Sequence, residues 1–404
     1  MRKMSSRCRL IPWVMAPAAL LIGTLCLVPG CGGETPRYIS IGTAPVGGTF
    51  PIIGGAVAEI LNHHPGAIRW KAQIRGSKGT QENIRRLASG EFELGIANAA
   101  ISYYAARGES SWEEEGAYDV RAVATLSPLV AMFITRRDTG IRRIADLKGK
   151  AIVVGPAGAG FEMFVRPILE EHGVAWNDVI KTYAPQGVSV DMLADGQADA
   201  AFLGGPISGA ASISQAKSSF EVYIVPYDAD KKKLTSNPRY PFFREIPHAA
   251  VKKAYRDLVD YSAYEDPIPE SDLYWLNVGS MQIITHKDTP YDLVYELTKT
   301  LWNQRSALRA QHPAFTAMNI RSVPASKGQP QPTKWRIIQG AVLSTGIDFH
   351  PAAAEFYEKE ATYTTDAANP VAGAIQLGYR PTRDNIASRR IDTMPPDDTA
   401  KKKP

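Results

Sequence analysis

Four glycine- and hydroxyl-rich loops, each between a strand pattern and a helix pattern, constrain the fold of this chain more than any other feature. Before the first loop, residues 38–41 alternate apolar and polar side chains as a strand does, and after it residues 54–61 have the small and apolar composition of a buried helix. The loops are 42–51 (GTAPVGGTFP), 76–80 (GSKGT), 155–160 (GPAGAG) and 204–206 (GGP). A glycine loop that opens a helix can bind an anion, because free N–H groups and the helix dipole point into it. One such loop alone is better explained as a plain connection between a strand and a helix.

The rest of the chain alternates strand and helix patterns, which predicts an α/β fold with mainly parallel sheets. Two short strands are expected at 121–126 and 129–135, separated by Ser127-Pro128, and another at 278–286. Residues 227–272 are rich in proline, tyrosine and charge, and we expect them to run over the surface. Because the four loops fall in two α/β blocks, they predict two lobes that close on a ligand at the carboxyl ends of the strands.

The first 31 residues have the layout of a secretory signal. Residues 1–9 are basic, residues 10–28 are mostly apolar, and small residues precede Cys31. This layout resembles a bacterial lipoprotein signal, in which Cys31 becomes the acylated first residue of the mature chain. Plain cleavage is an alternative, and so is an uncleaved anchor helix, since the apolar run is nearly long enough to span a bilayer. All three alternatives place the remaining chain outside the cytoplasm.

The body that follows the leader carries little net charge and no cysteine. The formal charge of +5 includes four basic residues before position 10 and no acid before Glu34, so removing those four leaves about +1. This balance does not indicate a nucleic-acid surface. The three cysteines are Cys8, Cys26 and Cys31, so the body has no disulfide and no thiolate metal site.

The sequence contains no catalytic constellation that we can identify. The loops lack the Gly-Lys-Ser/Thr of a P-loop and the G-x-G-x-x-G spacing of a dinucleotide loop, and no serine has the glycine flanks of a nucleophile elbow. His63-His64 has no acidic partner at metal-ligand spacing, and Asp191, Asp195 and Asp199 are better explained as a solvated face. We therefore predict a binding protein rather than an enzyme, with no metal and no cofactor.

The same loops resemble the motifs of a known family, the TAXI-type solute receptors of TRAP (tripartite ATP-independent periplasmic) transporters. The resemblance runs from about residue 38 to residue 360. The matching motifs, in the family's order, are Ile41-Gly42-Thr43 with Gly54-Gly55-Ala56, Ser77 to Ile84, Gly90-Glu91 with Leu94 to Ala97, Asp146 to Lys150 with the loop to Gly160, Tyr295 to Lys299, His312-Pro313-Ala314 and Phe349-His350-Pro351. Jointly these motifs are specific, although no single one is.

The resemblance implies a periplasmic-binding-protein-like fold of type II, with two α/β lobes, a hinge and a ligand cleft between the lobes. It also implies that a small solute, an organic acid or amino acid, is handed to TRAP-type membrane permease subunits. We expect a signal peptide at 1–30, lobe I at 37–143 and 226–360, lobe II at 144–225, and a largely disordered tail at 361–404. We further expect a monomer in the periplasm that is held at the membrane by a lipid on Cys31 and binds no nucleic acid.

Departures from the family's motifs change the expected ligand. A tyrosine hydroxyl of the first loop is missing at Phe50, hydroxyls common in the third loop are replaced by Ala159 and Phe161, and Lys78 replaces a glycine. The pocket thus loses donors and gains apolar surface, so we expect a carboxylate that is smaller or more apolar than glutamate. The expected ligand-binding residues are Thr43, Gly47, Gly48, Thr49, Phe50, Ser77, Thr80, Gln81, Asn98, Ser127, Gly158, Ala159, Gly160, Phe161, Gly205 and Pro206. Each hydroxyl among them could instead cap a helix or bond within a turn.

Two other classes of function remain open on the same scaffold. A ligand-sensing lipoprotein could present its bound solute to a membrane sensor kinase rather than to a transporter. An extracytoplasmic enzyme is the other alternative, because a fold does not fix a function. A permease subunit encoded beside this chain would favour transport, whereas a two-component kinase there would favour sensing.

Overall fold

The computed structural model describes residues 35–318 and 346–359, apart from 229, 231–232, 238–239, 241 and 265. The described residues from Pro36 onward belong to one compact unit. Within this part of the chain, no helix has both the length and the apolar character needed to cross a membrane. The predicted signal peptide, the predicted lipid site Cys31 and the predicted tail lie outside the described residues.

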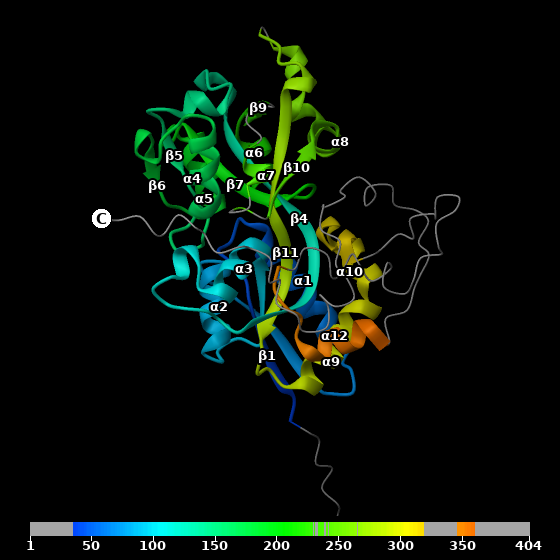
Figure 1. The fold of residues 1–404 in the computed structure, drawn as a ribbon. Coiled ribbons are helices and arrows are strands. Elements are labelled where there is room, and N and C mark those ends of the chain that lie inside the picture. The colour runs from blue at the N-terminus through cyan, green and yellow to red at the C-terminus, as the bar shows by residue number, and fades with distance from the viewer. Residues whose placement is uncertain are drawn as a thin grey trace, which may run out of the picture. The chain divides into compact units, whose positions relative to one another are not determined.

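The described strands form one mixed sheet (Figure 1). They are β1 (Arg37–Gly42), β2 (Trp70–Arg75), β3 (Leu94–Asn98), β4 (Val120–Arg136), β5 (Ala151–Val153), β6 (Ile180–Thr182), β7 (Ala200–Pro206), β8 (Val222–Val225), β9 (Tyr227–Asp228), β10 (Phe243–Pro247) and β11 (Leu273–His286). Their order is β2-β1-β3-β11-β4-β7-β5-β6, with β8 on β4 and with β9 and β10 on β11. The pairs β1–β2, β1–β3, β5–β6 and β5–β7 are parallel, while the pairs made by β4 and β11 are antiparallel.

Two strands, β4 and β11, run through both halves of this sheet. The first part of β4 pairs with β11 as far as Pro128 opposite Ser280, and its second part pairs with β7 from Leu129 onward. The first half of β11 pairs with β9 and β10, and its second half pairs with β3 and β4. We call the part around β1, β2 and β3 the first lobe, and the part around β5, β6 and β7 the second lobe. The predicted α/β fold with two lobes is confirmed, and the predicted residue boundaries of the lobes stay predictions. The prediction of mainly parallel pairing is wrong, because six of the ten pairs among the described strands are antiparallel.

The strand β4 is continuous over 17 residues, so the predicted break at Ser127-Pro128 is wrong. Pro128 has no N–H to give to a ladder, and prolines are tolerated in strands where such a donor is not required. The residue lies where β4 changes its partner from β11 to β7. The proline therefore marks a change of pairing rather than the end of a strand.

Residues 227–272 do not run over the surface as predicted, because several of them are built into the second lobe. They include β9, β10 and two helices, and β10 pairs with the first half of β11. Tyr227, Phe243, Ile246 and Val251 are buried. The prolines and charges between these apolar residues hide any regular period, which is why the sequence pattern misses them.

The helices pack on the sheet and on one another (Figure 1). They are α1 (Thr49–His63), α2 (Thr80–Ala88), α3 (Ala99–Arg107), α4 (Glu162–Glu171), α5 (Gln186–Ala194), α6 (Ala211–Ser219), α7 (Lys233–Ser236), α8 (His248–Val259), α9 (Tyr291–Asn303), α10 (Arg305–Gln311) and α12 (Pro351–Lys359). The helix α9 buries Leu293, Val294, Leu297 and Leu301 against its neighbours, which include α1 and α12. Burying each such side chain contributes about 1.5–3 kcal/mol, so this face fixes α9 and α12 on the first lobe.

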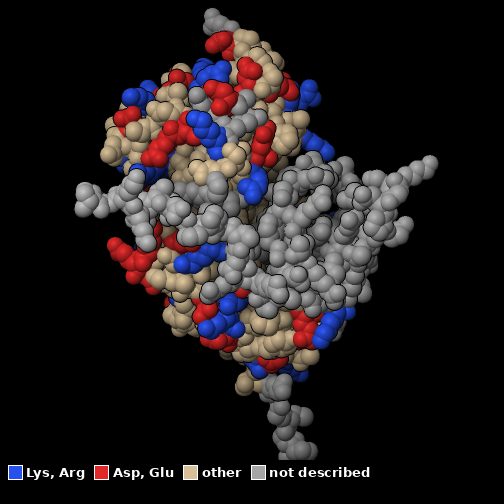
Figure 2. Space-filling view, viewed as in Figure 1, with Lys and Arg blue, Asp and Glu red and all other residues tan. Residues whose placement is uncertain are grey.

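Charges of both signs are mixed over the described surface in view in Figure 2, where neither sign dominates. Many of them form exposed ion pairs, such as Arg166 with Glu170 and Arg37 with Asp292. This distribution agrees with the small net charge predicted for the body.

Candidate ligand-binding site

A cavity lies between the two lobes, at the point where three of the predicted glycine-rich loops meet the end of β7. Its volume is about 60 Å³. This is the volume open to the centre of a water molecule, and a single water needs about 10–15 Å³ of it. The cavity therefore has room for roughly five waters or one small solute. The residues that line it are Ala44, Pro45, Gly48, Thr49, Phe50, Lys78, Gly79, Thr80, Asn98, Leu129, Pro156, Ala159, Phe161, Phe164, Gln186, Phe202, Gly204, Gly205, Val278 and Met281.

Four helices begin at this cavity, two from each lobe. The N-cap residues of α1, α2, α4 and α5 are Gly48, Gly79, Phe161 and Pro185, and none of them caps its helix with a side chain. The first N–H groups of a helix have no partner within the helix, and the helix dipole places partial positive charge there. The cavity is therefore electrostatically suited to a negatively charged group.

Two of the polar lining side chains are already hydrogen-bonded within the protein. Asn98 caps α3, since its Oδ1 accepts from Ala100 N–H at 2.8 Å, and its Nδ2 donates to Val278 O at 3.1 Å. Gln186 donates from Nε2 to Gly204 O at 3.0 Å and accepts at Oε1 from the Ser212 hydroxyl at 2.9 Å. These bonds hold the cavity wall in place and use one of the two N–H donors of each amide.

Two buried hydroxyls retain a proton that they can donate. Thr80 Oγ1 accepts from Asn98 N–H at 3.0 Å, and Thr49 Oγ1 accepts from Ala211 N–H at 3.5 Å. In both bonds the threonine is the acceptor, so its own O–H is not consumed. The second bond also joins the two lobes, because Thr49 begins α1 and Ala211 begins α6.

The rest of the lining is apolar apart from one charge. Lys78 is the only charged residue among the twenty described residues that line the cavity. It is exposed, and a Cβ built on Gly158 would lie 3.9 Å from its Cδ, so its side chain reaches across to the second lobe. Phenylalanine side chains come from both lobes, and the rings of Phe161 and Phe202 are 5.9 Å apart in an edge-to-face arrangement.

The structure brings half of the sixteen predicted ligand-binding residues into the lining. These are Gly48, Thr49, Phe50, Thr80, Asn98, Ala159, Phe161 and Gly205. The others, which lie outside the lining, are Thr43, Gly47, Ser77, Gln81, Ser127, Gly158, Gly160 and Pro206. Residues of all four predicted loop segments line the cavity, but residues 204–206 are the end of β7, paired with β4, so the prediction of a fourth loop is wrong.

Hydrogen bonds within the loops explain why several predicted donors do not face the cavity. Thr43 Oγ1 donates to Arg75 O at 3.0 Å, and Ser77 Oγ donates to Thr43 O at 3.0 Å. Gln81 donates to the Ser111 hydroxyl at 2.7 Å, away from the lining. These side chains hold the loops in shape, which is the alternative that the sequence left open for each hydroxyl.

The remaining predicted residues lie near the cavity in other roles. Ser127 donates to its neighbour's carbonyl, Pro128 O, at 3.0 Å. Gly160 lies against Ile101, and its φ of +93° is a conformation that favours glycine. Such positions fix backbone paths around the cavity rather than offering groups to a solute.

Much of the apolar wall is not among the residues predicted to bind a ligand. Phe164, Phe202, Leu129 and Met281 line the cavity but lie in helices or strands rather than in glycine loops. Their pattern in the sequence is that of ordinary core residues, so it gives no signal of a binding role. Gln186 was also not predicted. It is the first residue of α5, which is another helix that begins at the cavity.

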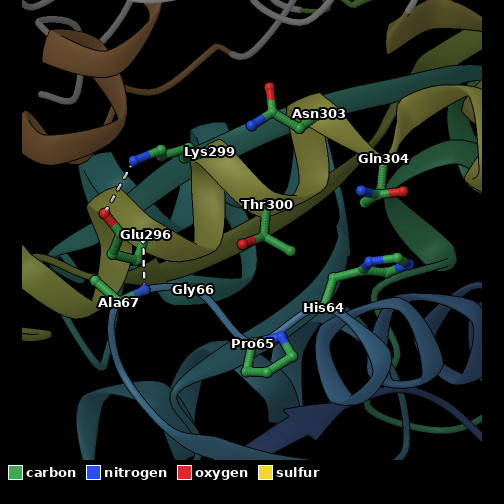
Figure 3. A pocket seen from close by; sticks show the side chains of 9 residues that line it. All are labelled: His64, Pro65, Gly66, Ala67, Glu296, Lys299, Thr300, Asn303 and Gln304. Carbon is green, nitrogen blue, oxygen red and sulfur yellow. Dashed lines mark hydrogen bonds and ion pairs between the residues drawn. The ribbon is translucent and has the colours of Figure 1, made fainter.

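A second hollow lies on the first lobe, between the end of α1 and α9, and has a volume of about 280 Å³ (Figure 3). Its lining is His64, Pro65, Gly66, Ala67, Glu296, Lys299, Thr300, Asn303 and Gln304. Glu296 accepts from Ala67 N–H at 3.2 Å and pairs with Lys299 at 3.5 Å. Glu296 thus links α9 to the loop between α1 and β2. Its carboxylate is used in these structural contacts. Among the described residues, no group of three His, Cys, Asp or Glu side chains could hold a metal ion.

Comparisons with known proteins give one family match and several distant structures. A model of the NMT1-like family matches residues 41–260. A structure of a periplasmic transporter is 16% identical with a TM-score of 0.42, over 69% of this chain and 84% of that chain. A structure from work on glutathione import via GshT and the cystine ABC importer TcyBC of Streptococcus mutans is 12% identical with a TM-score of 0.42, over 75% of this chain and 100% of that chain. The periplasmic aliphatic sulphonate binding protein SsuA from Escherichia coli is 15% identical with a TM-score of 0.37, over 69% of this chain and 78% of that chain.

Proposed function

This chain belongs to the NMT1-like family, and from that premise we propose that it is an extracytoplasmic solute receptor. It binds a small organic anion between its two lobes and delivers that anion to a membrane transporter of the TRAP type. Binding and release, rather than bond breaking, is the proposed activity.

The observation that carries this proposal is the composite lining of the cavity. Residues from the first lobe, such as Thr49 and Thr80, face residues from the second lobe, such as Phe161 and Gly205. The strands β4 and β11 join the lobes and also contribute Leu129 and Met281 to the lining. A solute held by both lobes stabilises the arrangement in which they touch, which is how a two-lobe receptor reports that it is loaded.

The charge of the solute is inferred from the surroundings of the cavity. Four helix N-termini and the Lys78 side chain favour a negative group, and no acidic side chain opposes it among the described residues of the lining. A carboxylate is the commonest small organic group of this charge. The apolar wall supports a solute with less polar surface than glutamate.

Delivery to a TRAP-type transporter is proposed from the motifs that resemble TAXI receptors, such as residues 77–84 and 312–314. The predicted lipoprotein signal supports a receptor held at the outer surface of the membrane by Cys31. A TRAP transporter works without ATP, so uptake of the solute should continue when cells are depleted of ATP but keep their ion gradients. Loss of uptake on ATP depletion would overturn this part of the proposal.

Solute binding is tested by titration calorimetry of the purified protein with a panel of organic acids, amino acids, and neutral and cationic solutes. We expect one organic anion to bind with one-to-one stoichiometry and to raise the melting temperature by mass action. Lys78→Gln should weaken that binding, whereas Lys71→Gln, an exposed lysine outside the cavity lining, should not. Binding of neutral or cationic solutes alone would contradict an anion receptor.

A further inference from the structure

We propose that the cavity selects an aromatic monocarboxylate that carries no amino group. The inference rests on the proposed function and narrows the solute from organic anions in general to one chemical class.

The charges at the cavity admit one negative group and no positive one. Lys78 is the single cation of the lining, and none of the twenty described lining residues is acidic. The ammonium group of an amino acid would therefore lose its hydration without gaining a carboxylate partner, which is strongly unfavourable. A second carboxylate would likewise lack a charged side chain to pair with.

The few polar groups that remain free also limit the solute. The amides of Asn98 and Gln186 are bonded within the wall. The donors that remain are the hydroxyl protons of Thr49 and Thr80, one N–H on each of these amides, and the N–H groups at the helix starts. These donors suit the two oxygens of one carboxylate, and a solute with further hydroxyl or amine groups would leave them unpaired.

The apolar part of the wall is suited to a ring. Phe50 from the first lobe and Phe161, Phe164 and Phe202 from the second contribute four aromatic side chains to one small cavity. Phe161 and Phe202 already meet edge to face at 5.9 Å, and aromatic groups gain from offset and edge-to-face contacts with one another. A planar ring between them would extend this arrangement, which an aliphatic chain cannot do.

The position of Lys78 gives the solute an orientation. This lysine precedes the start of α2 and is exposed at the cavity, while Phe202 is fully buried. The carboxylate therefore points toward Lys78 and the N-termini of α1 and α2, and the ring points toward Phe202. The room of roughly five waters suits a single six-membered ring with its carboxylate, and excludes two fused rings with a side chain.

The test is a set of titrations with four probes. Benzoate is the reference, cyclohexanecarboxylate lacks the aromatic ring, benzyl alcohol lacks the charge, and L-phenylglycine adds an ammonium group together with the carbon that carries it. We expect benzoate to bind about two- to tenfold more tightly than cyclohexanecarboxylate and about 10- to 100-fold more tightly than benzyl alcohol. L-phenylglycine should bind at least about tenfold more weakly than benzoate.

Two matched pairs of variants test which side chains recognise the carboxylate and the ring. Lys78→Gln should reduce benzoate affinity about tenfold or more and leave benzyl alcohol unchanged, with Lys71→Gln as the control. Phe50→Leu should remove the preference for benzoate over cyclohexanecarboxylate, whereas Phe220→Leu, at a partly buried residue outside the lining, should keep it. Far-ultraviolet circular dichroism and melting temperature show that each variant is folded.

The outcomes separate this inference from the function on which it rests. If a dicarboxylate, sulphonate or aliphatic acid binds in a Lys78-dependent way while benzoate does not, the receptor function stands and the aromatic class is wrong. If L-phenylglycine binds as tightly as benzoate, the cavity does not exclude an ammonium group, and that part of the proposal is overturned. If no organic anion of any class binds, both proposals fail.

Discussion

Gly47 and Gly187 bring the backbones of the two lobes together with no side chain between them. A Cβ built on Gly47 would lie 2.6 Å from the Cα of Gly187, a separation that real Cβ atoms do not show. Gly47 lies in the first loop with a φ of +94°, and Gly187 is the second residue of α5. The close approach of the lobes at this point depends on glycine on both sides.

Replacing Gly187 by alanine should weaken solute binding by hindering this approach. Its Cβ would lie 3.1 Å from the Cα of Gly47 and 3.3 Å from Gln215 Oε1, so backbone or side chain must shift. Overpacking of this kind costs about 1–3 kcal/mol, which corresponds to a loss of about 5- to 140-fold in affinity. Gly47→Ala should be more severe, because the positive φ strains any side chain there. Calorimetry gives the affinity, and small-angle X-ray scattering with solute gives the radius of gyration.

Gly55→Ala is the matched control for these two variants. Gly55 lies inside α1, and a Cβ built on it would have no atom within 4 Å. Alanine is favoured over glycine by about 0.5–1 kcal/mol in a helix, so urea unfolding should show a gain of that size and calorimetry no change in affinity. An equal loss of affinity in Gly55→Ala and Gly187→Ala would show that closure is not what the glycine pair controls.

Two adjacent glycines of β7 should separate solute binding from stability. Gly204 and Gly205 both line the cavity, but a Cβ on Gly204 would meet nothing within 4 Å, while one on Gly205 would lie 2.8 Å from the Cβ of Ala210. Gly204→Ala should therefore reduce the room for a solute and weaken binding with little change in melting temperature. Gly205→Ala should lower stability by about 1–3 kcal/mol through overpacking. The prediction fails if the two variants lose stability equally.

Stability should fall as the pH drops below about 6.5, because two buried histidines must stay neutral. In His312 and in His350, Nδ1 accepts an N–H from the alanine two residues on, and Nε2 donates to a carbonyl of a distant residue. Burial lowers the pKa of both rings below the ordinary value of 6.5, despite those carbonyl bonds, which act in the opposite direction. The unfolded chain then takes up more protons than the folded one, so the contribution is complete above pH 6.5 and is lost as the pH falls toward the lower folded-state pKa.

Urea unfolding between pH 7.5 and pH 5 measures this effect. Each histidine can add at most about 1.4 kcal/mol per pH unit to the slope. His350→Gln should reduce the slope, whereas His64→Gln, at an exposed residue, should leave it unchanged. A slope that is the same in all three proteins would show that His350 does not control the pH dependence.

The ion pair of Arg85 and Glu115 should contribute little to stability in spite of its geometry. The two groups are 2.5 Å apart, and hydrogen bonds from Arg85 first and then Tyr118 lower the pKa of Glu115 to about 2. Both side chains are about one-third exposed, at 39% and 32%, so water screens the pair. Glu115→Gln should cost at most about 1 kcal/mol at pH 7 and low salt, and less in 1 M NaCl.

The pH dependence of that cost checks the assignment. The contribution of Glu115 is complete above its unfolded pKa near 4.5 and disappears as the pH falls through its folded value of about 2. Urea unfolding of the wild type and the variant should therefore converge at acid pH. A difference that persists there would mean that packing of Arg85 on the Trp112 ring, 4.8 Å from its centroid, is what the substitution disturbs.

The α/β fold and the convergence of three glycine loops could be predicted because both depend on local patterns. Glycines between a strand period and a helix period, as at residues 42–51 and 155–160, encode where a strand ends and a helix begins. Parallel strands place their carboxyl ends at one edge, so the meeting of the loops follows from the order of the elements. The buried threonines Thr49 and Thr80 were predicted for the same reason, since each opens a helix at such a loop.

The direction of individual side chains could not be predicted. Thr43 and Thr49 are hydroxyls of one loop, yet the first bonds to Arg75 O and only the second lines the cavity. Phe202 has the sequence pattern of a core strand residue, and its role depends on which face of β7 meets the first lobe. The three segments with wrong predictions, around Pro128, at residues 204–206 and at residues 227–272, also depend on partners that are remote in sequence.

The sequence by itself therefore determined the alternation of strands and helices, the glycine loops that open helices, and the near absence of charge from those loops, because these are properties of short contiguous stretches. Only the tertiary structure decided that β4 and β11 are shared by both lobes, that Gly47 meets Gly187, and that one lysine faces four phenylalanines across a cavity without acids among its described lining residues. Those relationships join residues that lie far apart in the sequence, Gly47 and Gly187 by 140 positions. Their geometry is set by sheet register and packing, which no local pattern encodes.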